Sequence, residues 1–143
     1  MPTLLSTTVR HIYDRVPNSV NSKLIEDFDS YMKDNATSER HQNNNLKAII
    51  AFAEFLGSDT TFYLVSTKDQ VTKFLDTKIR SNSDDPEKRW ITTWNDYLVR
   101  IKHFLRWFHN YKIRLDQSPD QLLSSTDWDT PAFLNIKKNE ISL

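Results

Sequence analysis

Large apolar residues recur at intervals of three and four between residues 86 and 112, and this spacing constrains the fold more than any other feature of the sequence. At about 100° per residue they fall within an arc of about 120° on a helix, which is the width of a buried stripe. The pattern predicts one long helix of about 25 residues, about 37 Å from end to end, which is enough to cross a small domain. The stripe consists of Trp90, Trp94, Tyr97, Leu98, Ile101, Phe104, Leu105 and Phe108.

Glycine and cysteine are nearly absent from the rest of the chain. The 143 residues include one glycine, Gly57, and no cysteine. β-Hairpins and phosphate-binding loops depend on glycine, so a β-rich fold and a glycine-rich nucleotide site are both disfavoured. The lack of cysteine excludes disulfides, thiolate catalysis and zinc sites with cysteine ligands. Together with the long stripe, this composition favours an all-α fold.

Shorter helices are predicted before the long one, and several have recognisable ends. Ser22 and Ser38 are expected to be N-caps, and Gly57 is expected to follow the end of the helix that begins at Ser38. Thr67 and Gln70 have the spacing of a capping box. Asp85 and Pro86 are expected to begin the long helix. The shorter helices are expected over residues 9–16, 22–35, 39–56 and 67–79.

The C-terminal part of the sequence is not predicted to form a long helix. Pro119–Leu123 is expected to form one short turn, and Trp128–Leu134 is expected to be an extended anchor that docks its aromatic side chains on the helices. Lys137–Leu143 is interpreted as a linker.

Positive charge is concentrated on the long helix, although the whole chain has 19 basic and 19 acidic residues. Between residues 86 and 112, six basic residues stand against Glu87 and Asp96. The face opposite the apolar stripe is expected to present arginine and threonine side chains, which are common donors to phosphate groups and base edges. A local excess of this kind is compatible with nucleic-acid binding even in a neutral chain.

The helix that begins at Ser38 offers a second polar surface. Its first half, residues 39–45, is entirely polar, and we expect it to project beyond the core and enter a major groove. Asparagine and glutamine can pair with adenine there, and arginine can pair with guanine. The candidate DNA contacts on the two helices are Arg40, Asn44, Lys47, Lys88, Arg89, Thr92, Thr93 and Arg100.

No catalytic, cofactor or metal site is predicted. His103 and His109 are six residues apart, so on a helix they point about 120° away from each other and cannot share a metal. The sequence has no nucleophile elbow, no Walker loop and no zinc-protease motif. The carboxylates are scattered, as solvated surface acids are.

The segment from Arg89 to Asn110 resembles the last long helix of the core-binding domain of tyrosine recombinases of the phage-integrase type. That helix has a threonine, an aromatic residue four positions later, a basic residue, and a Phe-x-x-Trp/Phe ending. The helix from Ser38 to Leu56 is similar to an earlier helix of that family, with a polar start followed by Leu-x-x-Ile-x-x-Phe. Trp128–Lys138 resembles the link into the catalytic domain of archaeal integrase-like proteins. The resemblance covers roughly residues 20–138.

This resemblance implies a SAM-like orthogonal bundle of four to five helices that forms half of a C-shaped clamp around duplex DNA. It implies an N-terminal arm or short helix at residues 1–20, the core-binding domain at 21–126, and an anchor and linker toward a catalytic domain at 127–143. The implied partners are double-stranded DNA, the catalytic domain of the same parent protein and other recombinase protomers. The implied parent protein breaks and rejoins DNA.

The family's catalytic half carries a His-x-x-Arg box, and His103-Phe104-Leu105-Arg106 matches it in letters. The match lies inside the helix of the DNA-binding half, with Phe104 and Leu105 on the apolar stripe. We interpret it as a coincidence and expect this chain to have no catalytic residues of its own.

An alternative function is a helical protein–protein interaction module that uses Trp107 as an exposed aromatic anchor, since aromatic residues dominate binding hot spots. In either case the sequence predicts a cytoplasmic location without membrane contact, because it has no signal-peptide pattern and no apolar run of about 20 residues.

Overall fold

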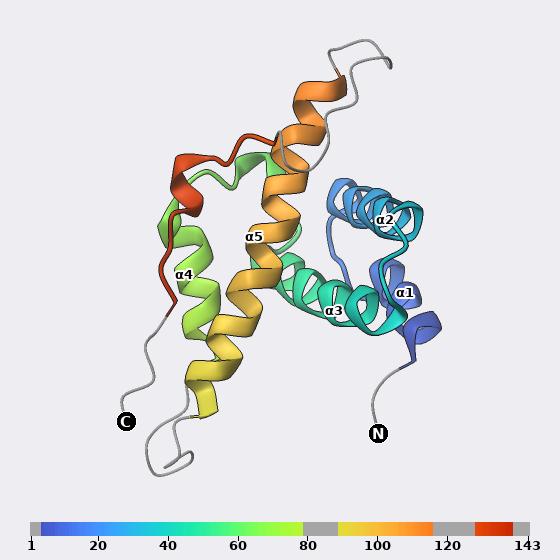
Figure 1. The fold of residues 1–143 in the computed structure, drawn as a ribbon, viewed down its shortest axis with the longest axis horizontal. Coiled ribbons are helices and arrows are strands. Elements are labelled where there is room, and N and C mark those ends of the chain that lie inside the picture. The colour runs from blue at the N-terminus through green and yellow to red at the C-terminus, as the bar shows by residue number, and fades with distance from the viewer. Residues whose placement is uncertain (1–3, 79–88, 116–127, 139–143) are drawn as a thin grey trace. The chain divides into compact units, whose positions relative to one another are not determined.

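The computed structural model of the chain describes residues 4–78, 89–115 and 128–138. Over these ranges it contains five α-helices and two short 3-10 helices, and it has no strand (Figure 1). The all-α class predicted from the sequence is confirmed. The chain divides into two compact units, Met1–Val65 and Ser66–Leu143, which are described separately below.

The first unit contains α1 (Leu5–Asp14), α2 (Ser19–Asp34), α3 (Glu39–Leu56) and the 3-10 turn η1 (Phe62–Leu64). α1 and α2 both pack against α3 and against each other. Residues 5–14 are therefore part of the packed unit, whereas the sequence suggested an arm or a short helix from residue 9. The fully buried large side chains here are Ile12, Ile25, Phe28, Met32, Leu46, Ile49, Phe52 and Phe62.

The start of α2 differs from the sequence prediction. The N-cap is Asn18, whose side-chain oxygen accepts hydrogen bonds from the backbone N–H groups of Val20 and Asn21. Ser22, the predicted N-cap, lies one turn inside the helix, and its hydroxyl donates to the backbone oxygen of Ile12 at 3.0 Å. Asparagine and serine cap helices about equally well, so propensity alone could not choose between them.

Both predicted ends of α3 are confirmed. The Ser38 hydroxyl accepts from the backbone N–H of His41, and Gly57 ends the helix with a φ of 80°. The run of asparagines near its start is explained by packing. Asn43 accepts a hydrogen bond from the buried Thr8 hydroxyl of α1, and the Asn45 amide is buried against the sulfur of Met32.

Asn21 connects α2 to the segment that follows α3. Its side chain is fully buried, its amide nitrogen donates to the backbone oxygen of Thr60 at 3.0 Å, and its oxygen accepts from the backbone N–H of Phe62 at 2.8 Å. Phe62 itself is buried, with its ring 6.1 Å from that of Phe52. The amide of Asn21 thus holds η1 in place so that the Phe62 ring reaches the core.

Replacing Asn21 with leucine, which has a similar size, should leave the Phe62 N–H and the Thr60 oxygen buried without these partners. The free energy of unfolding should fall by about 2–4 kcal/mol, because each unsatisfied buried group costs about 1–3 kcal/mol. Urea denaturation measures the loss. Ser30→Ala, at an exposed position of the same helix, is the control and should change stability little. Equal stability of the two variants would contradict this role of Asn21.

The second unit contains α4 (Lys68–Asp76), α5 (Arg89–Leu115) and the 3-10 turn η3 (Ala132–Leu134). The capping box predicted at Thr67 and Gln70 is present, with both of its reciprocal hydrogen bonds. α4 packs against α5, and the ring centroids of Phe74 and Tyr97 lie 5.9 Å apart in an edge-to-face contact. The Lys78 ammonium lies over both of these rings, at 5.3 and 4.9 Å from their centroids.

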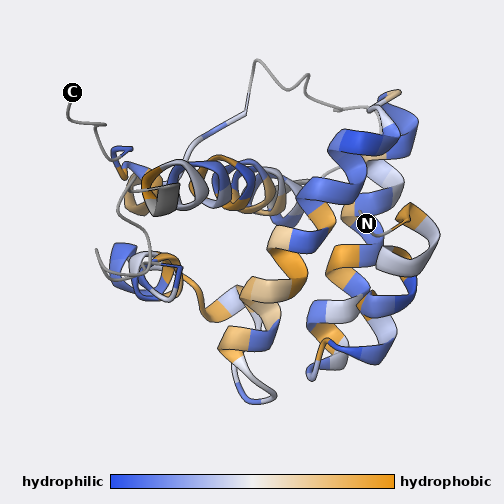
Figure 2. Cartoon of the chain, turned by 90° about the horizontal axis from the view of Figure 1, so that it is seen from below, coloured by the Kyte–Doolittle hydropathy of each residue, from blue (hydrophilic) through white to orange (hydrophobic). Residues whose placement is uncertain are grey.

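The long helix predicted around residues 86–112 is α5, a helix of 27 described residues. Its predicted start at Asp85 and Pro86 lies outside the described residues, as does the predicted turn at 119–123. The Trp90 side chain is likewise not described, and Tyr97 is half-buried. The other stripe residues are buried as predicted: Trp94, Leu98, Ile101, Phe104, Leu105 and Phe108. Each of the five described α-helices combines apolar and polar residues, as amphipathic packing requires (Figure 2).

Residues 128–138, here called the strap, run along α5 and contain η3. Apart from this one turn the strap has no regular secondary structure, and Trp128, Leu134 and Ile136 are buried. The predicted aromatic anchor is therefore confirmed for Trp128, while Phe133 is only half-buried. None of the described helices is long and apolar enough to span a membrane.

Candidate nucleic-acid interface

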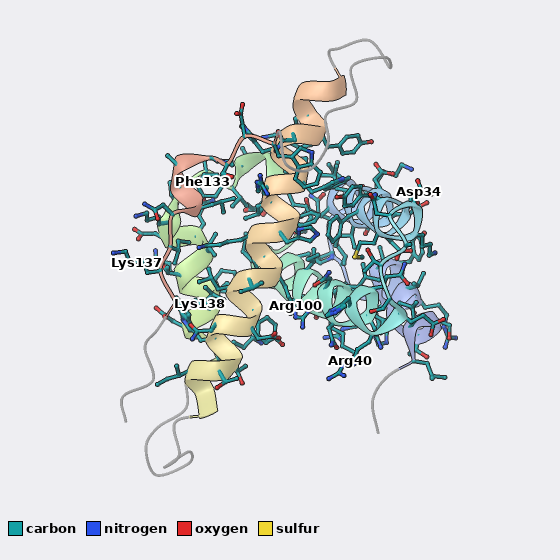
Figure 3. The ribbon with its side chains drawn as sticks, viewed as in Figure 1. Asp34, Arg40, Arg100, Phe133, Lys137 and Lys138 are labelled. Carbon is teal, nitrogen blue, oxygen red and sulfur yellow. The ribbon has the colours of Figure 1, made fainter. Side chains whose placement is uncertain are left out.

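Three predicted DNA contacts of the first unit lie on one face of α3. Arg40, Asn44 and Lys47 are spaced by four and three residues, which places their side chains within an arc of about 60°. Arg40 is exposed in the first turn, and its side chain extends away from α1 and α2 (Figure 3). Asn44 and Lys47 are half-exposed. Among the described residues, none of the three side chains has a hydrogen-bond or ion-pair partner.

The start of α3 does not project beyond the core, contrary to the sequence prediction. Gln42 is 4% exposed and Asn45 is 9% exposed, and Asn43 bonds to Thr8 of α1. The side chains of α3 that point toward α1 and α2 are therefore committed to packing. Only the outward face of this segment remains available to a ligand.

The candidates of the second unit lie on α5. Lys88 falls outside the described residues, and Arg89 is the first residue of the helix, with a side chain that is not described. Thr92 and Thr93 are exposed on the following turn, and their hydroxyls are free within the described part of the chain. These threonines are the donors that the structure places at this end of α5.

Arg100 differs from the other candidates because its side chain already has a partner. Its Nε donates to the Asp96 carboxylate at 3.0 Å, one turn earlier on α5, and the side chain is 16% exposed. A DNA phosphate would have to compete with this carboxylate. The candidate contacts therefore form one group on α3 and another on α5, in different units of the chain.

Trp107, the proposed protein-binding anchor, is buried. It is 5% exposed, and its ring lies 5.8 Å from that of Phe104 and 4.8 Å from that of Tyr111. The sequence placed it on the outer polar face. An exposed anchor at this position, on which the alternative function depended, is not present.

The His-x-x-Arg match at residues 103–106 has the surroundings that the sequence predicted. Phe104 and Leu105 are buried, and His103 lies on the opposite face of α5 with part of its surface exposed. Within residues 4–78, 89–115 and 128–138, no group of histidine and acidic residues is arranged to hold a metal ion.

A further polar feature lies between α5 and the strap, and we call it the strap recess. Its volume is about 610 Å³, and its cationic wall comes from α5. The Lys102 ammonium donates to the backbone oxygen of Ile136, and an Arg106 Nη donates to the backbone oxygen of Trp128 at 3.1 Å. The recess is lined by Val99, Lys102, His103, Arg106, Thr130, Pro131, Ala132, Leu134 and Asn135.

Positive charge is concentrated in this recess. Burial lowers the pKa of Lys102, and the nearby charge of Lys138 lowers it further. Burial also lowers the pKa of His103, with a second contribution from Arg106. His103 keeps an exposed surface, so this burial is partial. Both shifts have the sign that burial gives a cationic group, and the neighbouring cations act in the same direction.

Sequence reasoning counted Lys102 and Arg106 as part of a basic helix but did not find this recess. Their spacing, with His103, places three basic groups on neighbouring positions of one helix face. The other wall comes from Thr130 to Asn135, more than twenty residues later in the chain. Nothing in the local pattern shows where that segment returns to the helix.

Asn110 attaches the strap to α5. It is 3% exposed, its amide nitrogen donates to the backbone oxygens of Arg106 and Asp129, and its side-chain oxygen accepts from the Asp129 N–H. The Arg106 guanidinium stacks 5.5 Å from the centre of the Trp128 ring. These contacts fix one end of the strap and thereby the width of the recess.

Asn110→Ala should release this end of the strap. The Asp129 N–H should exchange with solvent faster, and the free energy of unfolding should fall by about 1–3 kcal/mol, because the N–H and the oxygen of Asp129 lose their partner inside the protein. Hydrogen exchange followed by NMR measures the first effect, and denaturation measures the second. His109→Ala, a half-exposed neighbour, is the control. Unchanged exchange at Asp129 would show that the strap is held by other contacts.

Comparison with protein-family models, curated proteins and solved structures gives no match to this chain.

Proposed function

We propose that this chain is a DNA-binding domain of the core-binding type, part of a site-specific tyrosine recombinase or integrase that grips duplex DNA as half of a clamp. The observation that carries the proposal is the outward face of α3, with Arg40, Asn44 and Lys47 in one row. These side chains supply two positive charges and one amide. Within the described part of the chain, none of the three makes a hydrogen bond or an ion pair.

The dimensions of this row suit a DNA groove. Arg40 and Lys47 are seven residues apart, so they are separated by about 10 Å along the helix axis. A major groove is about 12 Å wide and admits one α-helix. Arginine can bond a guanine edge or a phosphate, asparagine can pair with adenine, and lysine neutralises a phosphate.

The start of α5 supports a second set of contacts. Thr92 and Thr93 are exposed there, and threonine hydroxyls donate to phosphate oxygens. Arg89 and Lys88 are proposed as further DNA contacts, because they precede these threonines in the sequence. Arg100 is proposed as a weaker contact, because its bond to Asp96 has to be broken or shared.

The wider role rests on the resemblance of the α3 and α5 sequences to the recombinase family. On this proposal the chain performs no catalysis itself, and it works with the catalytic domain of the same parent protein and with further protomers on double-stranded DNA. Its location would be the cytoplasm, where the DNA of an archaeal host is found.

Removing the two α3 cations should weaken DNA binding. In titrations of the whole chain with duplex DNA at low salt, Arg40→Ala/Lys47→Ala should raise Kd. It should also reduce the slope of log K against log salt by about 2, because each phosphate contact contributes about 0.9. If Arg40 instead bonds a guanine edge, its loss should cost about 1–3 kcal/mol and relax sequence preference at that position.

The matched control is Lys68→Ala/Lys73→Ala, which removes the same charge from exposed positions of α4. If the control weakens binding as much as the α3 variant does, attraction is a property of net charge and the α3 interface is wrong. If the unmodified chain binds no duplex at low salt, and the α3 resonances do not move, DNA binding itself is refuted.

A further inference from the structure

The strap recess combines features that the proposed DNA contacts do not use. Its residues are all in the second unit, and none of them is among the candidates on α3 or at the start of α5. Its volume of about 610 Å³ falls within the range of small-molecule sites, about 300–1,000 Å³.

The recess has one cationic wall and one largely apolar wall. Lys102, His103 and Arg106 come from α5, whereas Pro131, Ala132 and Leu134 come from the strap. Thr130 and Asn135 add a hydroxyl and an amide on the strap side. No carboxylate lines the recess in the part of the chain that the structure describes.

The basic groups are also held in position. Lys102 is tied to the Ile136 oxygen by one of its three N–H groups, which leaves two for other acceptors. Arg106 is fixed by its bond to the Trp128 oxygen and by stacking on the Trp128 ring. A ligand would therefore meet donors whose side-chain entropy is already reduced.

We propose that the strap recess binds a small organic phosphate, with the phosphate group against Lys102, His103 and Arg106 and the apolar part of the ligand against the strap. A phosphate monoester supplies three acceptor oxygens and a charge near −2, which matches several clustered donors. An apolar or planar body fits the wall formed by residues 131–134. A purely apolar ligand would make no use of these charges.

The pKa of His103 can report phosphate binding, because charged groups surround this side chain. On α5 it faces Lys102 and Arg106, with the Asp96–Arg100 pair one to two turns away; on the strap the charged groups are Asp129, Lys137 and Lys138. Figure 3 shows Lys137 and Lys138 on the strap beyond η3. A bound phosphate would stabilise the imidazolium, so the pKa of His103, lowered in the free protein, should rise.

The test uses adenosine monophosphate as the probe and the whole chain in NMR titrations, with inorganic phosphate and adenosine as comparisons. Adenosine monophosphate should shift the His103 ring signals and the Thr130 and Asn135 amides and raise the pKa of His103. Inorganic phosphate should act on the same residues more weakly, and adenosine should bind least.

His103→Ala and Lys102→Met should each weaken binding of adenosine monophosphate about tenfold, the effect expected for one charge-assisted hydrogen bond. His109→Ala, on the same helix but outside the recess, should leave affinity unchanged.

Two outcomes would overturn the proposal: no shift at these residues at millimolar probe, or equal binding of adenosine and adenosine monophosphate. Competition with duplex DNA then distinguishes the sources of the phosphate. If duplex DNA displaces the probe, the recess takes a backbone phosphate; if both bind together, it takes a free organic phosphate. If the chain binds the probe but not DNA, the proposed function alone is refuted. If it binds DNA but not the probe, the proposal for the recess alone is refuted.

Discussion

Backbone groups of non-helical segments must find partners when those segments lie against apolar helix faces, and in this chain buried asparagines supply them. Asn21 bonds the segment after α3, and Asn110 bonds the start of the strap. Each amide gives a donor and an acceptor to the same short stretch of backbone, as a neighbouring strand would. These asparagine–backbone hydrogen bonds therefore determine where Phe62 lies in one unit and where Trp128 lies in the other.

Much of the helical architecture could be predicted because its causes are local. The stripe of α5, the capping box of α4 and the serine and glycine at the ends of α3 each act within a few residues of sequence. The start of α2 was misplaced because Asn18 and Ser22 are both good caps, and only tertiary contacts separate them. Asn18 also bonds the backbone of Ser58, and Ser22 bonds that of Ile12.

The candidate sites were less predictable than the helices for the same physical reason. Hydropathy shows that a residue is polar, but it does not show whether its hydrogen bonds are made inside the protein. Gln42 and Asn45 are polar and buried, and Trp107, which its helical position predicts on the polar face of α5, is buried too. Arg40 and Lys47 differ from Arg100 only in the structure, where the first two are free and the third bonds Asp96. The strap recess requires two segments that are distant in sequence.

The capping box at Thr67 bears on how the chain is joined together. The backbone N–H groups of Ser66 and Thr67 both donate to the Gln70 side chain, while those of Leu64 and Val65 donate to the oxygens of Thr61 and Phe62. On each side of the 65–66 peptide bond, these hydrogen bonds therefore join residues at most four positions apart, and none of them crosses that peptide bond. Extra residues inserted at that point would break none of these bonds, whereas an insertion inside a helix would interrupt its hydrogen-bond ladder.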